Sequence, residues 1–322
     1  MSKALKKILV TGGAGFIGSS LVDSLLANDH SEVEVFCIDN FDNFYDEAVK
    51  RKNLANALLH PRFQLLQGDI RDIDFLNTVF KTKFDVIVHL AARAGVRPSI
   101  EQPLLYEDVN IKGTINLLEQ AKLYNITQFV FASSSSVYGV NPRTPWSEED
   151  YVLNPISPYA STKVAGELIG HTYSHLYNIR FVALRFFTVF GPRQRPDLAI
   201  HKFHKLITNN KPIPFFGDGS TSRDYTFVDD IVAGIKAAID YNGSMYEVIN
   251  LGNNRTVTLV QLIEAIEYSI GKKAVLDKQP AQAGDVPHTF ASVEKAKKLL
   301  QYVPTTSLEQ GLEKFKKWYL KN

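Results

Sequence analysis

Cysteine is almost missing from this sequence, since Cys37 is the only one among 322 residues. A single cysteine cannot form a disulfide within the chain, and it cannot supply a CxxC metal site. Disulfide-stabilised scaffolds and cysteine-based zinc sites are therefore excluded. We predict no metal site, and we expect a reducing compartment, the cytoplasm.

Long hydrophobic runs are also lacking. No apolar stretch approaches the roughly 18 residues that a membrane-spanning helix needs. The first residues, MSKALKKILV, combine lysines with apolar residues, but the apolar run stops at TGGAGFIG without the longer core of a signal peptide. We expect no membrane association.

An excess of one charge is the third missing feature. The chain carries 36 basic and 34 acidic side chains, for a formal net charge of +2. Because the two signs are interspersed, no basic face for nucleic acid or for a membrane surface is indicated. A small anionic molecule is compatible with this balance.

Short apolar runs alternate with helical patterns over the first two thirds of the chain. The runs are KKILVT, EVEVFCID, FQLLQGD, FDVIVHLAA, FVFASS and RFVALRFF. Such alternation predicts an α/β fold, a doubly wound parallel Rossmann sheet with helices on both faces, because parallel strands need long crossovers and are buried on both sides.

The pattern changes after about residue 190. Pro- and Gly-bearing segments appear there, with helices expected near 199–209, 229–241, 258–269 and 307–320. We predict a dinucleotide-binding domain over 1–190 and a smaller, partly interleaved α/β domain over 191–322. The apolar run YEVINLG at 246–252 reads as a buried strand, so 228–252 is expected to rejoin the first domain.

A glycine motif follows the first predicted strand. In ILVTGGAGFIG, Gly12, Gly15 and Gly18 are three residues apart, and an apolar-periodic helix begins near Phe16 and Ile17. Glycines at this place permit a tight turn and close approach of backbone N–H groups to a pyrophosphate, which the helix N-terminus favours. The motif predicts a dinucleotide site.

An acidic residue ends the second predicted strand. Asp39 is placed to accept hydrogen bonds from the adenosine ribose of a dinucleotide. Asn40 and Phe41 follow it, and no arginine stands there to neutralise a 2′-phosphate. We therefore predict NAD as the cofactor in preference to NADP.

Other strand ends contribute to the same edge, where ligands of open α/β sheets collect. Asp69 and Ile70 follow the third strand and are expected near the adenine. Leu90, Ala91 and Ala92 follow the fourth and offer backbone and small side chains. His89 is interpreted as a packed histidine at a strand end.

A serine, a tyrosine and a lysine form the predicted reactive set. Tyr159 and Lys163 in PYASTKVAGE are four residues apart at the start of a helix, hence on one face. The phenol has a reference pKa of about 10, which a nearby ammonium and the positive charge of bound NAD+ lower. Ser134, at the end of the fifth strand, supplies a hydroxyl for the same substrate oxygen. A second match, Tyr268 and Lys272, follows no serine-bearing strand.

These motifs together resemble the extended short-chain dehydrogenase/reductase family. TGGAGFIG, Asp39, SSSSVYG, YASTK and RDYTFVDD look like the nucleotide-sugar epimerases and dehydratases within it. The resemblance covers essentially the whole chain. It implies NAD as a tightly held cofactor, Tyr159 as catalytic base, Lys163 on the nicotinamide ribose, Ser134 as hydroxyl partner and Asn110 among the cofactor-binding residues.

The serine run favours one reaction of that family. Dehydratases resemble this chain but carry Thr-Asp-Glu beside VYG, and related decarboxylases carry a Glu before it. Ser134, Ser135 and Ser136 supply no carboxylic acid to protonate a leaving hydroxyl. The resemblance thus implies 4-epimerisation of a UDP-sugar through a transient 4-keto sugar.

The sugar is inferred from further similarities. The surroundings of Arg97, Thr188 and Arg195, and QAGDVPHT around Asp285, look closer to UDP-glucuronate 4-epimerases than to UDP-galactose epimerases. Ser135, Ser136 and Thr188 are expected to hold the sugar carboxylate, Phe216 to flank uracil, and Arg223 and Asp285 to contact diphosphate and uridine ribose. Epimerisation of UDP-glucose or UDP-N-acetylglucosamine, decarboxylation of UDP-glucuronate and a non-enzymatic nucleotide sensor remain alternatives.

The quaternary structure is likewise implied by the resemblance. Helices expected at about 103–123 and 157–177 resemble the pair that forms a four-helix interface between two subunits in this family. We therefore expect a homodimer.

Overall fold

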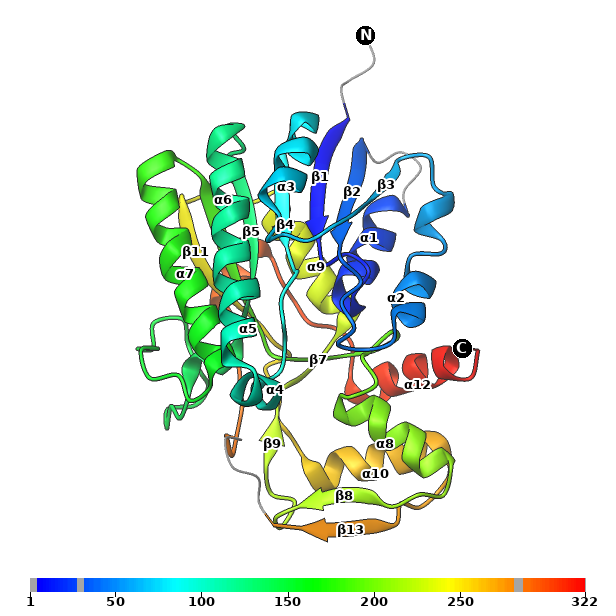
Figure 1. The fold of residues 1–322 in the computed structure, drawn as a ribbon. Coiled ribbons are helices and arrows are strands. Elements are labelled where there is room, and N and C mark those ends of the chain that lie inside the picture. Colours follow the sequence, from blue (N-terminus) through cyan, green and yellow to red (C-terminus); the bar gives the residue numbers. More distant parts are fainter. Residues whose placement is uncertain (1–4, 28–31, 281–285, 322) are drawn as a thin grey trace.

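The computed structural model describes residues 5–27, 32–280 and 286–321. Within them, the centre of the fold is a seven-stranded parallel sheet in the order β3-β2-β1-β4-β5-β6-β11 (Figure 1). This confirms the predicted doubly wound sheet. The strands are β1 (Lys6–Thr11), β2 (Val33–Asp39), β3 (Phe63–Gln67), β4 (Val86–His89), β5 (Gln128–Ser134), β6 (Arg180–Phe186) and β11 (Tyr246–Leu251).

Helices cover both faces of this sheet (Figure 1). On one face, α1 (Phe16–Leu26) and α9 (Val228–Ile239) pack side by side, and Ile8 and Val10 of β1 belong to their core. On the other face lie α3 (Ile73–Val79), α6 (Gly113–Leu123) and α7 (Pro158–Tyr177), whose core includes Leu9. Neighbouring β1 residues thus enter opposite cores, which explains the uninterrupted apolar run.

The stretch predicted as one helix over 103–123 is interrupted. It consists of α5 (Pro103–Glu107), a π-helical turn η3 (Asp108–Lys112) and α6. Asn110 lies in that turn and is buried; its side-chain amide donates to the carbonyl of Arg93 and to the hydroxyl of Thr162 on α7. The wider turn therefore ties α6 to the start of α7, consistent with the frequent occurrence of such turns near functional sites.

Shorter helices complete this part of the fold. They are α2 (Glu47–Asn53), η1 (Ala57–Leu59), η2 (Phe80–Thr82), α4 (Val96–Glu101) and η4 (Ser135–Tyr138). The element η4 is one short 3-10 turn that takes up the serine run directly after β5, so those serines form the end of a strand and the turn that follows it, not a linker.

The remaining elements lie mostly below the main sheet in Figure 1. Here α8 (Ala199–Thr208) and α10 (Leu259–Ile270) pack together, and β8 (Ile213–Phe216) pairs in parallel with β13 (Leu276–Gln279). Two small ladders join this region to the rest: β7 (Thr188–Phe190) with β10 (Tyr225–Phe227), and β9 (Ser222–Arg223) with β12 (Val257–Thr258). Helices α11 (Glu294–Leu300) and α12 (Leu308–Tyr319) come last.

Local sequence explains where the long helix α7 begins. Ser157 is its N-cap, and its hydroxyl accepts a hydrogen bond from the backbone N–H of Ala160. Pro158 occupies the first helical position, where its missing N–H leaves no bond unmade. Tyr159 and Lys163 are thereby fixed in the first two turns of a well-defined helix.

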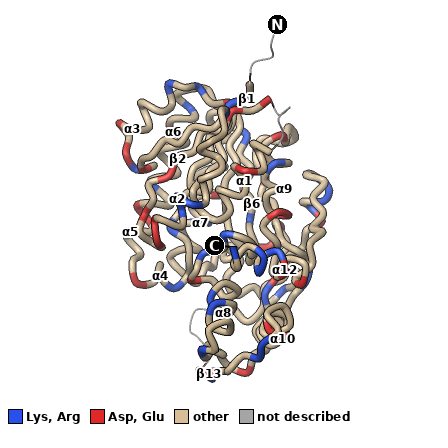
Figure 2. The backbone as a smooth tube through the Cα atoms, turned by 90° about the vertical axis from the view of Figure 1, so that its right-hand side faces the viewer, with Lys and Arg blue, Asp and Glu red and all other residues tan. Residues whose placement is uncertain are grey.

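Charges of both signs are distributed over the molecule (Figure 2). Lys and Arg as well as Asp and Glu occur across the face that this view shows. In the described residues, no helix is long and apolar enough to cross a membrane.

Candidate active site

A cavity of about 500 Å³ opens along the carboxyl ends of the central strands. It is lined by residues that follow β1, β2, β3, β4, β5 and β6, from Gly12 near one end to Thr188 near the other. This is the edge at which ligands of doubly wound sheets bind. The motifs found in the sequence therefore converge on one site.

The glycine turn adopts the geometry that its spacing predicts. Gly12 has φ of 71°, a conformation that side chains disfavour, and a Cβ there would lie 2.7 Å from the backbone nitrogen of Ala91. At Gly18 a Cβ would lie 2.2 Å from the carbonyl oxygen of Gly12. Gly15 caps α1 without any side-chain hydrogen bond, so the helix N-terminus presents backbone N–H groups to the cavity.

Asp39 is buried at the end of β2 and lines the cavity. Its carboxylate accepts hydrogen bonds from the backbone N–H groups of Ala14 (3.0 Å) and Phe41 (2.9 Å). Burial raises the pKa of Asp39, and these two bonds oppose the increase. Asp39 therefore connects the glycine turn to the loop after β2 and has carboxylate oxygens beside the cavity.

Asp69 and Asn40 meet on the same side. The Asn40 amide donates to Asp69 over 2.8 Å, and Arg71 forms an ion pair with Asp69 at 2.8 Å. Burial alone would raise the pKa of Asp69, but the hydrogen bonds from Arg71 and Asn40 outweigh it and lower the pKa to about 2. Ile70 lines the cavity beside them.

His89 is a packed residue, as predicted. Its ring nitrogens lie 2.7 Å from the hydroxyl of Thr11 and 3.0 Å from that of Thr114, and 2% of the residue is exposed. Burial, together with the charge of Lys163, lowers its pKa to about 3. The neutral imidazole thus supports the strand end, and Leu90, Ala91 and Ala92 line the cavity beyond it.

Ser134, Tyr159 and Lys163 all line this cavity. Ser134 ends β5, and its hydroxyl accepts from the Ser136 N–H at 3.1 Å, capping η4. The Lys163 Nζ donates to the carbonyl of Ala132 over 2.7 Å and lies 5.9 Å from the centre of the Tyr159 ring. The structure therefore brings together three residues that come from β5 and α7.

Burial dominates the ionisation of this set. It raises the pKa of Tyr159, and the interaction with Ser134 and the charge of Arg195 counteract it. Burial lowers the pKa of Lys163 to about 8, opposed by the carboxylate of Glu167. Lys163, which was expected to lower the pKa of Tyr159, is not among the groups that shift it in the protein alone, and burial prevails over Ser134 and Arg195.

Only some of the residues predicted to bind substrate line the cavity. Ser136, Thr188 and Arg195 line the cavity, whereas Ser135, Arg97, Phe216 and Arg223 are not among its lining residues. The guanidinium of Arg97 lies 5.8 Å from the ring centre of Phe216, so these two meet across the space between α4 and β8. Asp285 lies outside the described residues.

Sequence reasoning missed a group of lining residues in the loop after β2. Phe44 is contacted on its ring by two guanidinium groups, Arg93 at 4.9 Å and Arg195 at 5.0 Å. Arg93 also pairs with Asp42. These cation–π contacts join residues that are far apart in the sequence, so spacing along the chain could not predict them. The arginines in AARAGVRP and GPRQRP were the only sequence signal for these contacts. Further lining residues outside the predicted set include Tyr45, Lys50, Phe186, Phe187 and Leu198.

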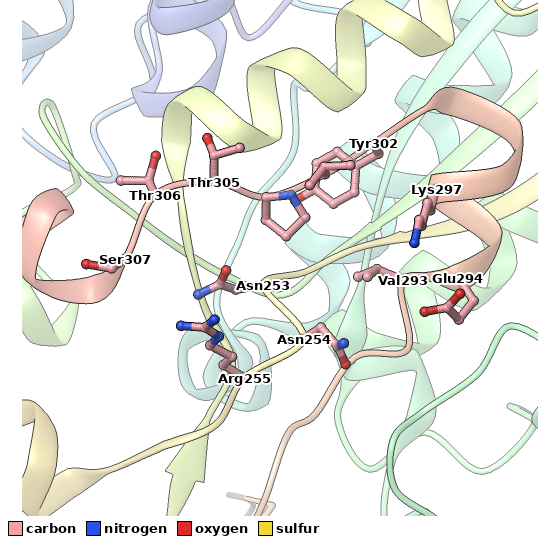
Figure 3. A pocket seen from close by; sticks show the side chains of 12 residues that line it. Asn253, Asn254, Arg255, Val293, Glu294, Lys297, Tyr302, Thr305, Thr306 and Ser307 are labelled. Atoms are coloured by element: carbon pink, nitrogen blue, oxygen red, sulfur yellow. The ribbon is translucent and has the colours of Figure 1, made fainter.

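A second cavity of about 360 Å³ lies elsewhere (Figure 3). It is bounded by the connection between β11 and β12, by α11 and by the segment before α12. Lys297 and Arg255 lie on opposite sides of it, and Glu294 adds a negative charge. None of the predicted site residues that the structure describes lines it, so the cavity at the strand ends is the candidate active site.

The fold and this set of residues define a class of protein. These features are those of the extended short-chain dehydrogenases/reductases. They are a parallel sheet with a glycine turn after its first strand, an acidic residue after its second, and a serine, a tyrosine and a lysine at one end of the cavity. The sequence matches the family described as GDP-mannose 4,6 dehydratase over residues 9–315. The chain belongs to this family.

Relatives in the family are similar over almost the full length. A UDP-glucuronate 4-epimerase of Thermodesulfobacterium geofontis is 43% identical over 98% of this chain and 96% of that protein. A crystal structure of UDP-glucuronic acid 4-epimerase from Bacillus cereus in complex with UDP-glucuronic acid and NAD is 39% identical, with a TM-score of 0.91 over 98% of this chain and 99% of that one.

A neighbour with another sugar is almost as similar in fold. UDP-N-acetylglucosamine 4-epimerase from Methanobrevibacter ruminantium, in complex with UDP-N-acetylmuramic acid, is 32% identical, with a TM-score of 0.90 over 99% of both chains. Fold similarity alone therefore does not separate the sugars.

Proposed function

We propose that this chain is an NAD-dependent UDP-sugar 4-epimerase whose favoured substrates are UDP-glucuronate and UDP-galacturonate. The observation that carries the proposal is the end of the cavity around Ser134, Tyr159 and Lys163, which no carboxylate lines among the described residues. In the described part of the chain, the carboxylates that line it are Asp39, Asp42 and Asp69, all from the β2 and β3 side. Hydroxyls, a phenol and an ammonium surround the other end, so elimination of water lacks an acid there.

NAD fits the cavity through features of this chain. The uncapped N-terminus of α1 suits a pyrophosphate, and Asp39 suits the hydroxyls of a ribose. Lys163 uses one N–H on Ala132 and has two further donors for the nicotinamide ribose. When bound, NAD supplies the acceptor and donor of hydride in this family.

Proton transfer falls to Tyr159. As the phenolate it accepts the proton of the sugar 4-OH, and as the phenol it returns that proton to the 4-keto oxygen after the sugar has turned over. Ser134 holds the same oxygen through its hydroxyl. The hydrogen bond with Ser134 and the charge of Arg195 favour the phenolate against the effect of burial, and burial excludes water from the reacting end.

The favoured sugar follows from the hydroxyls near Ser134. Oxidation at C4 of a glucuronate gives a β-keto acid, which loses carbon dioxide when its carboxylate aligns with the ketone. Ser136 and Thr188, which line the cavity, and Ser135 would hold the carboxylate through neutral hydroxyls, without the fixed orientation of an arginine fork. This arrangement favours epimerisation over decarboxylation.

The uridine diphosphate is assigned to residues of 191–322. Arg195 lines the cavity; Arg223, Phe216 and Asp285 are proposed contacts, and Arg97 reaches the same region from α4. In this proposal residues 1–190, with 228–252, form the cofactor domain, and the remaining C-terminal residues form the substrate domain.

A homodimer is part of the proposal. Exposed apolar side chains occur on α5, α6 and α7: Leu104 is 81% exposed, Leu123 63% and Leu168 56%. Leu168 and Leu176 are eight residues apart and therefore share one face of α7. Exposed apolar residues on neighbouring helices favour association with a second copy.

A cytoplasmic location completes the proposal. Cys37 is a buried free thiol, which suits a reducing compartment. NAD and nucleotide sugars are also metabolites of that compartment.

The test is a panel of sugars. Purified protein is incubated separately with UDP-glucuronate, UDP-galacturonate, UDP-glucose and UDP-N-acetylglucosamine, and the 4-epimers are resolved by chromatography while carbon dioxide is monitored. We expect the two uronates to interconvert without carbon dioxide, and Tyr159→Phe to abolish the reaction. Conversion of UDP-glucose alone would remove the uronate assignment, and UDP-pentose with carbon dioxide would establish the decarboxylase.

A second candidate substrate is UDP-N-acetylglucosamine. Its support is the similarity to the Methanobrevibacter enzyme, which has nearly the same TM-score as the uronate epimerase. The same panel separates the two, because preferential turnover of the acetylated sugar would contradict a role for Thr188 and Ser136 in holding a carboxylate.

A further inference from the structure

A buried ion pair lies directly behind the end of β5. Glu167 on α7 accepts two hydrogen bonds from the Arg185 guanidinium of β6, at 2.9 and 2.7 Å. The side chains of Arg185 and Glu167 are 3% and 5% exposed. A third hydrogen bond reaches Glu167 from the hydroxyl of Ser133 at 2.5 Å. All three side chains are thus fixed by one another.

This pair is anchored in the surrounding sheet. Arg185 pairs in register with Ser133 of β5 and with Asn250 of β11. Its guanidinium lies 4.7 Å from the ring centre of Tyr138, whose hydroxyl donates to Asn250 over 2.7 Å. A charge pair held so firmly is costly to bury, since desolvation can exceed the attraction between the charges. Its retention beside a reactive set calls for a role beyond stability.

Glu167 and Lys163 are four residues apart on α7, so both side chains lie on one face of the helix. Lys163 is buried, and its Nζ has the carbonyl of Ala132 as its hydrogen-bond acceptor and the Phe131 ring at 5.0 Å. Neither contact supplies a negative charge. An ammonium in such a place tends to lose its proton.

The other ionisable groups around Lys163 offer no compensation. His89 of β4 is neutral and buried, Tyr159 of α7 is a phenol in the ligand-free protein, and Arg185 of β6 is itself cationic. Glu167 is the group whose charge favours the Lys163 ammonium, against the effect of burial.

We propose that Glu167 is a positioning residue that keeps Lys163 protonated at the reacting end of the cavity, and that Arg185 and Ser133 hold its carboxylate in place. The inference rests on the proposed function, because it assigns to Lys163 the part of a cation beside Tyr159. Ser133 and Ser134 then have different tasks: one fixes the carboxylate behind the strand, and the other faces the substrate.

The proposal predicts different effects for the two members of the pair. In Glu167→Gln the side-chain volume is kept, the negative charge is lost and Arg185 remains, so the Lys163 ammonium loses its support. In Arg185→Met the carboxylate remains near Lys163. A purely structural pair would affect folding and activity in both variants, without a preferred direction for the Lys163 ionisation.

The experiment measures kcat/KM against pH and, independently of turnover, the ionisation of Lys163. The second quantity comes from the Cε chemical shift of isotope-labelled lysine, assigned by its loss in Lys163→Met. We expect Glu167→Gln to move the alkaline midpoint and the lysine titration down by about one pH unit or more, Glu167→Asp to retain both, and Arg185→Met not to lower them.

A matched control is available in Glu148. This half-buried carboxylate accepts from the backbone N–H of Asn250 at 2.7 Å, and the charge of the same arginine acts to lower its pKa, but it is not among the groups that shift Lys163. Glu148→Gln should leave the lysine titration unchanged. If Glu167→Gln fails to fold with a lone buried arginine, the double variant E167Q/R185M removes both charges, and it should still lower the titration.

Equal downward shifts in Glu167→Gln and Arg185→Met, or no shift in any folded variant that lacks Glu167, would overturn the proposal. Failure of the proposed function is distinguishable. Full activity in Tyr159→Phe would remove the epimerase mechanism while the lysine titration still reports whether Glu167 sets the charge of Lys163.

Discussion

The backbone N–H of Asn253 donates a 2.7 Å hydrogen bond to the carboxylate of Asp224, a residue with no exposed surface. The same carboxylate accepts from the Thr226 hydroxyl and from the backbone N–H of Ala291. Asp224 thus joins the segment before β10, the loop after β11 and residue 291. Burial raises its pKa to about 6, although these hydrogen bonds oppose the increase.

This relationship predicts a pH-dependent stability. Asp224 has an ordinary pKa of 3.8 in the unfolded chain and about 6 in the fold, so the unfolded chain releases its proton first as the pH rises. The free energy of unfolding of the wild type minus that of Asp224→Asn should therefore fall by about 2 kcal/mol from pH 4 to pH 6 and level off above about pH 7. Urea unfolding at a series of pH values measures it.

A difference between wild type and Asp224→Asn that stays flat from acid to neutral pH would contradict the raised pKa.

Removal of the Ser134 hydroxyl should slow the chemical step. Ser134→Ala takes away the interaction that opposes the raised pKa of Tyr159, so less phenolate forms near neutral pH. We expect kcat to fall about a hundredfold with little change in KM, measured with the best substrate of the panel. Ser161→Ala, two residues beyond Tyr159 and on the exposed side of α7, should retain activity. Wild-type kcat in Ser134→Ala would exclude a part for Ser134 in proton transfer.

Retention of the cofactor should depend on Asp39. Asp39→Ala removes the acceptor of the Ala14 and Phe41 N–H groups together with the proposed ribose contact. The amount of NAD released when the purified protein is denatured should fall well below that of the wild type. Asp39→Asn keeps the shape of the side chain and tests the charge alone. Wild-type NAD content in both variants would argue against this position of the ribose.

The proposed dimer should depend on the apolar surface of α7. Leu168→Glu places a charge in the expected interface, where burying an unpaired carboxylate is costly, and should yield monomers in sedimentation at micromolar concentration. Leu59→Glu is the control, because Leu59 is 87% exposed on the remote η1 and its replacement should leave the assembly intact. A wild type that sediments as a monomer would refute the dimer.

Local sequence was sufficient for the main elements of the fold. The apolar runs around Ile8, Val35 and Val130 are continuous because residues on both faces of the sheet are buried, and this property is visible without coordinates. The helices expected near 199–209, 229–241, 258–269 and 307–320 agree with α8, α9, α10 and α12 to within two residues at each end. The π-helical turn at Asp108–Lys112 was not predicted, because it preserves an ordinary helical pattern. Helix α11 and the short strands β7, β9, β10, β12 and β13 were not predicted either.

The sequence by itself determined the glycine turn, the acidic residue after the second strand and the reactive set, because each depends on spacing within a strand, a turn or a helix. Gly12, Asp39, Ser134, Tyr159 and Lys163 all line the cavity that their spacing predicted.

Only the tertiary structure decided which neighbours these residues have. The packing of β5, β6 and α7 sets the contacts between Glu167, Arg185 and Ser133. The same packing places Ser136 at the cavity, whereas Ser135 is not among its lining residues. The pKa values of Tyr159 and Lys163 depend on the same packing, because burial is the largest influence on both. Spacing along a chain reports neither burial nor contacts between distant segments, and these set the charges on which the proposed chemistry depends.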